Sequence, residues 1–289
     1  CFTVIGDVTS LLVWTRGAVT PTTYTAALVL PALFATIIPT YLIGRKLPPH
    51  LDLKRANVMM YRGNDTDVKL WQQILMFFLG MGGLWFVPTF YRLTSLPPFL
   101  GALCVLGVLW VANEIINRKR ILSDHPLSRE TNRSLQYESM QMIMFFLGVG
   151  LCVDILIEVG AMNSVRNWCD QHIHNIYIMS LALGLVSSVM DNLALVISSI
   201  SIYPVLPDNT PGMTTYLQSF VENGQYCHLI TLSGSIGGCL LPIGNTAGYA
   251  LMKAEDVSIW WYIKHITLKV LLGWFVDLGI YCLVDYFRR

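Results

Sequence analysis

The chain has 289 residues, of which 54% are hydrophobic and only 13% are charged. Soluble domains usually carry about 25% charged residues, so this composition excludes an ordinary soluble protein and indicates an integral membrane protein. The net charge of +1 gives no reason to expect a nucleic-acid partner, and the seven cysteines contain no CxxC pair that would suggest a disulfide framework. We therefore expect an all-α, polytopic membrane protein embedded in a lipid bilayer.

Several apolar runs are long enough to cross a bilayer as helices. They are residues 21–44, 70–90, 99–116, 140–159 and 266–287. Basic side chains gather in residues 45–69 and again after residue 116, and basic loops face the cytoplasm. This makes 45–69 a cytoplasmic linker and places residues 160–175 in a polar loop outside the membrane.

Residues 176–202 are apolar at both ends but polar in the middle, where the sequence reads SSVMDNLALVISS. A re-entrant hairpin explains this pattern, because irregular polar backbone at membrane depth must be buried in protein or line a cavity. Asp191 is the strongest single candidate for function, since a carboxylate in an apolar segment is costly and usually functional. The alternative is a structural carboxylate capped by local hydroxyls. Its neighbours Ser187, Ser188 and Asn192 offer oxygen ligands that suit a hard cation.

The stretch LSGSIGGCLLPIGNTAGYALM (232–252) is too apolar for a surface loop and too rich in glycine for a regular helix. We predict a broken helix at about 226–252, whose freed carbonyls help to hold an ion. Four small polar side chains in this stretch are candidate ligands. They are Ser233, Ser235, Asn245 and Thr246.

The sequence also indicates an inverted repeat. Ile5-Gly6-Asp7 matches Ile243-Gly244-Asn245, and each is followed by a polar stretch and then by a long apolar run. On the predicted topology the two runs point in opposite directions, as in the inverted repeats of many secondary transporters. We therefore divide the chain into residues 1–44, the end of a first repeat, the linker 45–69, and a second repeat at 70–289.

Further acidic residues lie within or near the predicted spans. Asp7 is a candidate for cation binding or a helix N-cap, and the two roles are compatible. Asp154 and Glu158 share a helix face, because they are four residues apart, and either a proton pathway or a structural pairing would explain them. Asp277 lies deep in the last run, where a hydrogen bond to another helix is the expected role.

Three segments resemble NhaD-type sodium/proton antiporters of the ion-transporter superfamily. They are VIGDVTSLLVW (4–14), FYRLTSLPPFLGALCVLGVLWVANEI (90–115) and the region from SSVMDNLALV (187–196) through SGSIGGCLLPIGNTAGYALM (233–252) to WWYIKHIT (260–267). The resemblance implies that the cation site comprises Asp7, Thr9, Ser187, Asp191, Asn192, Ser233, Ser235 and Asn245. It places Na⁺ at Asp7, Asp191 and Asn192, and it implies a first-repeat hairpin before Cys1, so that the chain is N-terminally truncated. The sequence departs from the family at Asn245-Thr246, where relatives more often carry a Ser-Ala pair.

The implied function is exchange of Na⁺ or Li⁺ for H⁺ by alternating access in a bacterial inner membrane, with no cofactor. A proton and a cation would compete for the same carboxylate. One alternative is an Na⁺- or H⁺-coupled carrier of dicarboxylate-type anions on the same scaffold. Another is a membrane-embedded enzyme, although no nucleophile or metal-ligand motif occurs. The sequence leaves the oligomeric state open, including a homodimer.

Overall fold

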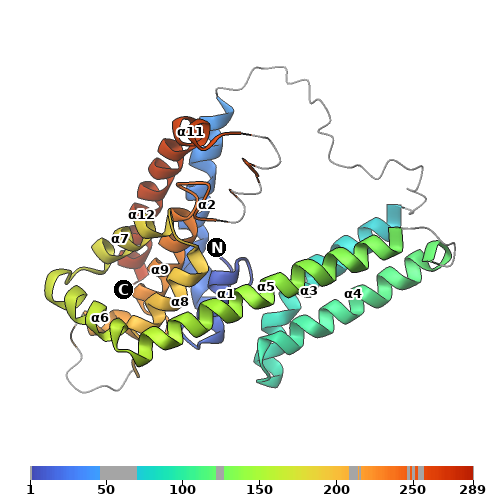
Figure 1. The fold of residues 1–289 in the computed structure, drawn as a ribbon, viewed down its shortest axis with the longest axis horizontal. Helices are drawn as coiled ribbons and strands as arrows, with labels where there is room; N and C mark the ends of the chain where they lie inside the picture. The colour runs from blue at the N-terminus through green and yellow to red at the C-terminus, as the bar shows by residue number, and fades with distance from the viewer. Residues whose placement is uncertain are drawn as a thin grey trace. The chain divides into compact units, whose positions relative to one another are not determined.

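The computed structural model describes residues 2–45, 70–121, 127–207, 214, 216–245, 248, 251–252 and 257–288 (Figure 1). These residues are mainly helical, and their only β pairing is an isolated bridge between Leu206 and Val221. The chain forms two compact units, the first from Cys1–Pro48 and Phe146–Arg289 and the second from Pro49–Phe145. The predicted all-α class is confirmed. The linker expected at 45–69 falls almost entirely outside the described residues, and the inverted repeat with its boundaries stays a prediction.

The second unit contains a helical hairpin. α3 (Leu70–Thr94) and α4 (Pro98–Ile121) lie side by side and are joined by residues 95–97 (Figure 1). Pro98 opens α4, a position where the missing backbone N–H costs nothing. Both helices have the length and hydropathy of membrane spans, which confirms the predicted spans at 70–90 and 99–116.

The first unit contains the remaining helices and the end of a helix shared with the second unit. In chain order they are α1 (Val8–Thr15), α2 (Pro21–Gly44), α5 (Leu127–Glu158), α6 (Ala161–His172), α7 (Ile176–Ser187), α8 (Asn192–Ile202), the 3₁₀ turn η1 (Leu217–Phe220), α9 (Gln225–Gly237), α11 (Ile259–Tyr262), the π-helical turn η2 (Ile263–Thr267) and α12 (Leu268–Arg288). α2 coincides with the predicted first span. The last span starts earlier than predicted, because α11, η2 and α12 form one continuous apolar helix over Ile259–Phe287.

One prediction for this unit was wrong. Residues 160–175 were expected to form a polar loop, but they contain α6, which follows α5 after a bend of 71°. Met162 of α6 is buried with Val153 of α5 and with Leu193 and Ile197 of α8. The polar residues of this segment therefore belong to an amphipathic helix, whose apolar side is anchored in the core.

Residues 176–202 form two short apolar helices, α7 and α8, separated by residues 188–191, and the re-entrant course through the membrane stays a prediction. Tyr203, just after α8, donates a hydrogen bond of 2.7 Å to Asp170, which lies shortly before α7. His174 and Tyr216 complete the same region, with ring centroids 5.9 Å apart. Both ends of the helix pair therefore lie on one side of the unit, as a re-entrant hairpin requires.

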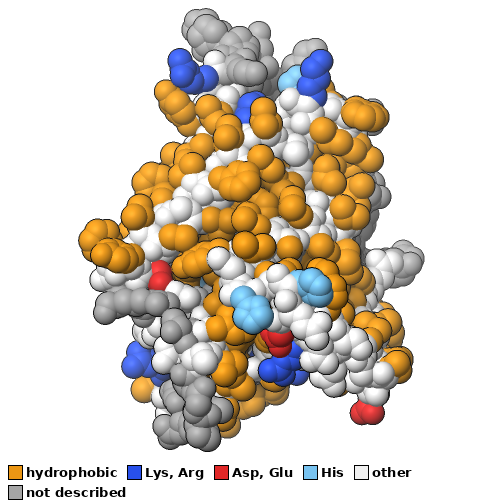
Figure 2. Space-filling model, turned by 90° about the vertical axis from the view of Figure 1, so that its left-hand side faces the viewer, with side chains coloured by type: hydrophobic (Ala, Val, Ile, Leu, Met, Phe, Trp, Pro, Cys, Tyr) orange, Lys and Arg blue, Asp and Glu red, His pale blue; other side chains and the backbone are white. Residues whose placement is uncertain are grey.

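The outer surface of the first unit is suited to lipid. Figure 2 shows a face that is largely covered by hydrophobic side chains, with the charged side chains towards its upper and lower ends. On α2, the large side chains of Leu30, Phe34 and Ile37 are exposed. Such apolar surfaces are expected where helices face the hydrocarbon core, so the chain is a multi-pass membrane protein.

Glycines hold the broken segments together. A Cβ on Gly237 of α9 would lie only 2.7 Å from the Cα of Gly184 of α7, and a Cβ on Gly184 would collide with the Trp274 ring of α12. Real Cβ atoms do not tolerate such distances from backbone. α7 and α9 therefore approach each other closely because these residues have no side chain, as small residues allow at helix interfaces in membranes.

We predict that Gly237→Ala destabilises the protein by about 1–3 kcal/mol, the usual cost of overpacking. The matched control is Gly279→Ala on α12, where nothing lies within 4 Å of the added Cβ. Thermal unfolding in detergent, followed by tryptophan fluorescence, should show a lower midpoint for Gly237→Ala and none of this loss for Gly279→Ala. Equal midpoints for the two variants would contradict the close packing.

Candidate functional site

Four helix ends meet where the helices of the first unit are broken. α7 and α9 end there, while α1 and α8 begin there (Figure 1). The ends of α7 and α9 are joined by a hydrogen bond of 2.6 Å from Ser187 Oγ to the Gly234 carbonyl. Helix C-termini carry partial negative charge and helix N-termini carry partial positive charge. The region therefore combines carbonyl groups with two polar N-termini, and a carboxylate lies at each N-terminus.

Asp7 is the centre of the most compact polar cluster in this region. Its carboxylate caps α1 by accepting a hydrogen bond from Val8 N at 2.8 Å. Its Oδ2 atom also accepts from Thr9 Oγ1 at 2.6 Å and from Ser235 Oγ at 2.9 Å. The two hydroxyl oxygens are 3.2 Å apart, so three oxygen atoms form a small triangle. Thr9 is fully buried, whereas Asp7 is half-buried.

Asp191 occupies the corresponding position at the start of α8. Its Oδ2 accepts hydrogen bonds from Leu193 N at 3.1 Å and from Ala194 N at 3.4 Å. The carboxylate is half-buried, while Asn192 beside it is buried. Among the described residues, no recorded hydrogen bond joins Asp191 or Asn192 to Asp7. The structure thus brings Asp7, Thr9 and Ser235 together directly and places Asp191 at a neighbouring helix start.

Three carbonyls near the break of α9 accept hydrogen bonds from hydroxyl groups of other helices, and one of them, Gly234 O, also accepts the backbone bond from Gly238 N at 3.1 Å. Besides the Ser187–Gly234 contact, Tyr262 donates to Cys239 O at 2.8 Å and Thr267 donates to Leu240 O at 2.6 Å. Tyr262 and Thr267 are five residues apart, and the π-helical turn η2 runs from the residue after Tyr262 to Thr267 itself. The i→i+5 spacing of such a turn brings them to one side of the helix. Carbonyls at this break were expected to help hold an ion, and each of the three already has at least one protein donor.

The other predicted ligands have different surroundings. Ser188, just after α7, donates to Leu185 O of that helix at 2.7 Å. Ser233 is completely buried, with its Oγ 2.5 Å from Ser180 Oγ and 3.4 Å from the Trp274 indole nitrogen. Asn245 is half-buried and contacts the Cys239 sulfur at 3.8 Å. Thr246 lies outside the described residues.

The acidic residues of the spans differ sharply in burial. Asp154 and Glu158 on α5 are both exposed, and their role in a proton pathway stays a prediction. Asp277 is completely buried, and neither carboxylate oxygen has a hydrogen-bond partner among the described residues. The prediction that Asp277 forms a hydrogen bond to another helix was therefore wrong. Ionisable residues deep in apolar runs usually have a function, so the position of Asp277 in the sequence was already a signal for one.

Comparisons with known proteins find sodium/proton antiporters among the proteins similar to this chain. Sodium/proton antiporter 1 of Arabidopsis thaliana is 30% identical over 295 residues, covering 98% of this chain and 46% of the relative. Sodium/proton antiporter 2 of the same plant is 28% identical, covering 99% of this chain and 64% of the relative. The Na(+)/H(+) antiporter NhaD of Vibrio cholerae is 25% identical, covering 99% of this chain and 59% of the relative.

The chain thus spans between 46% and 64% of the length of these three relatives. No family model matches it, and no solved structure matches it significantly. The similarities extend through the helix breaks described above, because they cover nearly the whole chain. They confirm the predicted resemblance, and the chain is a relative of the NhaD-type sodium/proton antiporters.

Proposed function

We propose that the protein exchanges Na⁺, or Li⁺, for H⁺ across a membrane. The observation that carries this proposal is the pair of helix N-termini, α1 and α8, each capped by its own aspartate at the breaks of the first unit. A carboxylate at such a position can bind either a proton or a cation. The relatives are named as sodium/proton antiporters, which fits this chemistry.

The Asp7 triangle has the chemistry of a site for a hard cation. Carboxylate and hydroxyl oxygens are the ligands that such ions prefer. Thr9 and Ser235 now donate to Asp7, and rotation of the two hydroxyls would turn their lone pairs towards a bound Na⁺. The Asp191 carboxylate and the Asn192 amide oxygen would supply ligands from α8. This set extends the site across the two broken segments.

Coupling follows from competition for the carboxylates. A carboxylate that has bound Na⁺ cannot keep its proton, and protonation removes the charge that attracts the ion. The two substrates are then carried in alternate halves of a cycle. The hairpin α7–α8 and the broken helix α9 are the elements that would move during alternating access, because their ends define the site.

The structure gives a specific argument against an anion carrier. Such carriers use the N–H groups of half-helix N-termini to hold the substrate anion. In this chain the Asp7 carboxylate accepts a hydrogen bond from Val8 N, and the Asp191 carboxylate accepts hydrogen bonds from Leu193 N and Ala194 N. The positive ends of α1 and α8 are thus already occupied by carboxylates, which repel anions.

The membrane itself is part of the proposal. The resemblance to bacterial carriers favours a bacterial inner membrane, whereas two of the relatives are plant proteins. Either setting provides a membrane with a proton gradient. Na⁺, Li⁺ and H⁺ are transported substrates, and the proposed mechanism assigns no step to a cofactor or to a second subunit.

Asp191→Asn should abolish exchange while the protein remains folded and inserted. Asparagine is as good an N-cap as aspartate, so the contacts to Leu193 N and Ala194 N can persist without the charge. The measurement is Na⁺-induced dissipation of a pH gradient in everted vesicles that contain the protein, with the amount of inserted protein measured in parallel. Normal exchange in this variant would remove Asp191 from the mechanism.

Ser235→Ala should raise the Na⁺ concentration required for half-maximal exchange by roughly tenfold, since one hydrogen bond to a charged group is worth about 1.5–3 kcal/mol. The maximal rate should change less, because Asp7 and Thr9 remain. The matched control is Ser201→Ala on α8, whose hydroxyl donates only to Ile197 O of its own helix. The same Na⁺ dependence in both variants would argue against a ligand role for Ser235.

A further inference from the structure

The buried face of α12 holds a carboxyl group that the cation site does not use. Trp274, Asp277, Leu278 and Tyr281 all lie on this face and are buried. Asp277 has no exposed surface, and neither of its oxygens has a hydrogen-bond partner in the part of the chain that the structure describes. A buried charge without a partner costs several kcal/mol or more. The surroundings therefore accommodate Asp277 best as a neutral, protonated acid.

Two polar contacts from α12 to α9 bracket Asp277. Three residues before it, the Trp274 indole nitrogen donates to Ser233 Oγ at 3.4 Å. Four residues after it, the Tyr281 hydroxyl lies 3.2 Å from His228 Nδ1. Residues three and four apart share a helix face, so Asp277 lies between these two contacts. The two contacts and Asp277 thus form a row of polar groups between α12 and α9, with the carboxyl group in the middle of the row.

The titratable groups on the elements packed against α12 are few. They are Tyr24 and Tyr41 on α2, Tyr177 on α7, Tyr226, Cys227 and His228 on α9, and Lys264 and His265 on η2, while α12 itself adds Lys269, Tyr281, Cys282, Asp285 and Tyr286. Lys264 and His265 are exposed and lie about 18 Å from Asp277 along the helix axis, at ~1.5 Å per residue. The titratable pair nearest to it along the buried face is His228 and Tyr281.

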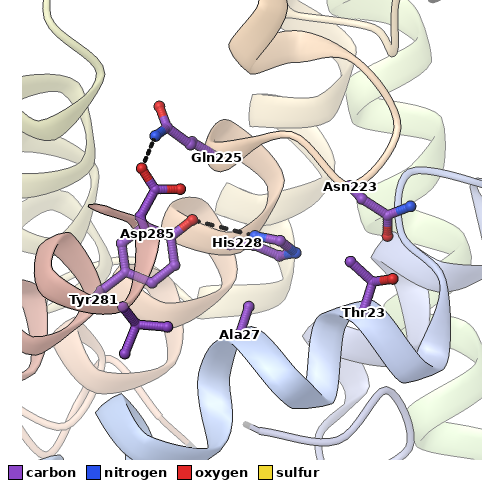
Figure 3. A pocket seen from close by; sticks show the side chains of 8 residues that line it. Thr23, Ala27, Asn223, Gln225, His228, Tyr281 and Asp285 are labelled. Atoms are coloured by element: carbon purple, nitrogen blue, oxygen red, sulfur yellow. Dashed lines mark hydrogen bonds between the residues drawn. The ribbon is translucent and has the colours of Figure 1, made fainter. Parts of the chain in front are cut away.

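This pair opens onto a hollow of about 250 Å³ at the end of the unit where α2 begins and α12 ends. Figure 3 shows His228 and Tyr281 facing each other, with Asp285 and Gln225 beside them and Thr23 across the hollow. Gln225 donates a hydrogen bond to Asp285. The His228 ring also lies 5.8 Å from the Tyr24 ring. The lining is polar enough to hold water. The predicted topology places this end of the unit on the outer side of the membrane.

We propose that Asp277 is a second proton-binding group of the exchange cycle, separate from the cation site, and that the hollow at His228 and Tyr281 is its access to water. A proton from water in the hollow passes to the His228–Tyr281 pair and then to the Asp277 carboxylate, which becomes the neutral acid. Release returns the same proton, so the step forms and breaks only O–H and N–H bonds. This inference rests on the proposed Na⁺/H⁺ exchange and adds a second proton site to it.

A purely structural role explains these observations less well. A carboxyl group that served packing would gain stability from a hydrogen bond, and replacement by an apolar side chain would remove the cost of burial. Ionisable residues inside membrane segments are generally retained for transport of ions or protons. Asp277 is as buried as a core residue, but its carboxyl group can bind and release a proton. The polar pair His228 and Tyr281 lies about one helical turn away along α12.

The test combines infrared spectroscopy with transport. In the purified protein, the carbonyl stretch of protonated carboxylic acids should lose one component in Asp277→Asn, and the control Glu222→Gln, at an exposed carboxylate, should keep it. In vesicles, Asp277→Asn should slow exchange by a factor of about 10² and change its pH profile. The Na⁺ concentration for half-maximal exchange should stay close to that of the unmodified protein.

Tyr281→Phe provides a second variant that keeps the packing of the ring and the Asp277 carboxyl group. It should slow exchange without altering the Na⁺ dependence, because only the access step is affected. An unchanged infrared band together with an unchanged pH profile in Asp277→Asn would overturn this inference alone. Failure of the unmodified protein to move protons in response to Na⁺ or Li⁺ would instead reject the proposed exchange itself.

Discussion

The structure depends on one constraint: backbone groups freed by a broken helix inside a membrane need partners within the protein. Hydroxyls of Tyr262 and Thr267 satisfy the carbonyls of Cys239 and Leu240 near the break of α9, and Ser187 gives the Gly234 carbonyl a second donor beside Gly238 N. These hydroxyl donors come from α7 and from the last span, so the break fixes the positions of its neighbours. Thr267, the last residue of the π-helical turn η2, contributes one of these donors.

Close packing and charge complete the arrangement. Gly184 and Gly237 let α7 and α9 approach until no side chain fits between their backbones. At the start of α1 and α8, Asp7 and Asp191 offset the positive helix ends. The interactions that stabilise the breaks thus place carboxylates beside carbonyls and hydroxyls, and this combination suits a cation better than an anion.

The acidic groups of the first unit fall into two environments. Asp7 and Asp191 are half-buried and hydrogen-bonded at helix N-termini. Asp277 is enclosed without a partner among the described residues and suits a proton rather than a larger ion. In the proposed cycle, Asp277 would add one proton site to the carboxylates at which Na⁺ and H⁺ compete. The structural distinction lies in burial and hydrogen bonding, since all three residues have the same side chain.

The sequence alone determined the all-α class, the apolar spans and the two helix breaks, because hydropathy, glycine and proline act locally. It also pointed to Asp7 and Asp191, since a carboxylate in an apolar run is conspicuous. Only the tertiary structure decided which residues meet. The contact of Asp7 with Ser235 joins positions far apart in the chain, and the helical form of residues 161–172 depends on burial of Met162. The neighbouring sequence could not show that Asp277 lacks a hydrogen-bond partner among the described residues. That depends on which side chains α2 and α9 place around it in the folded protein.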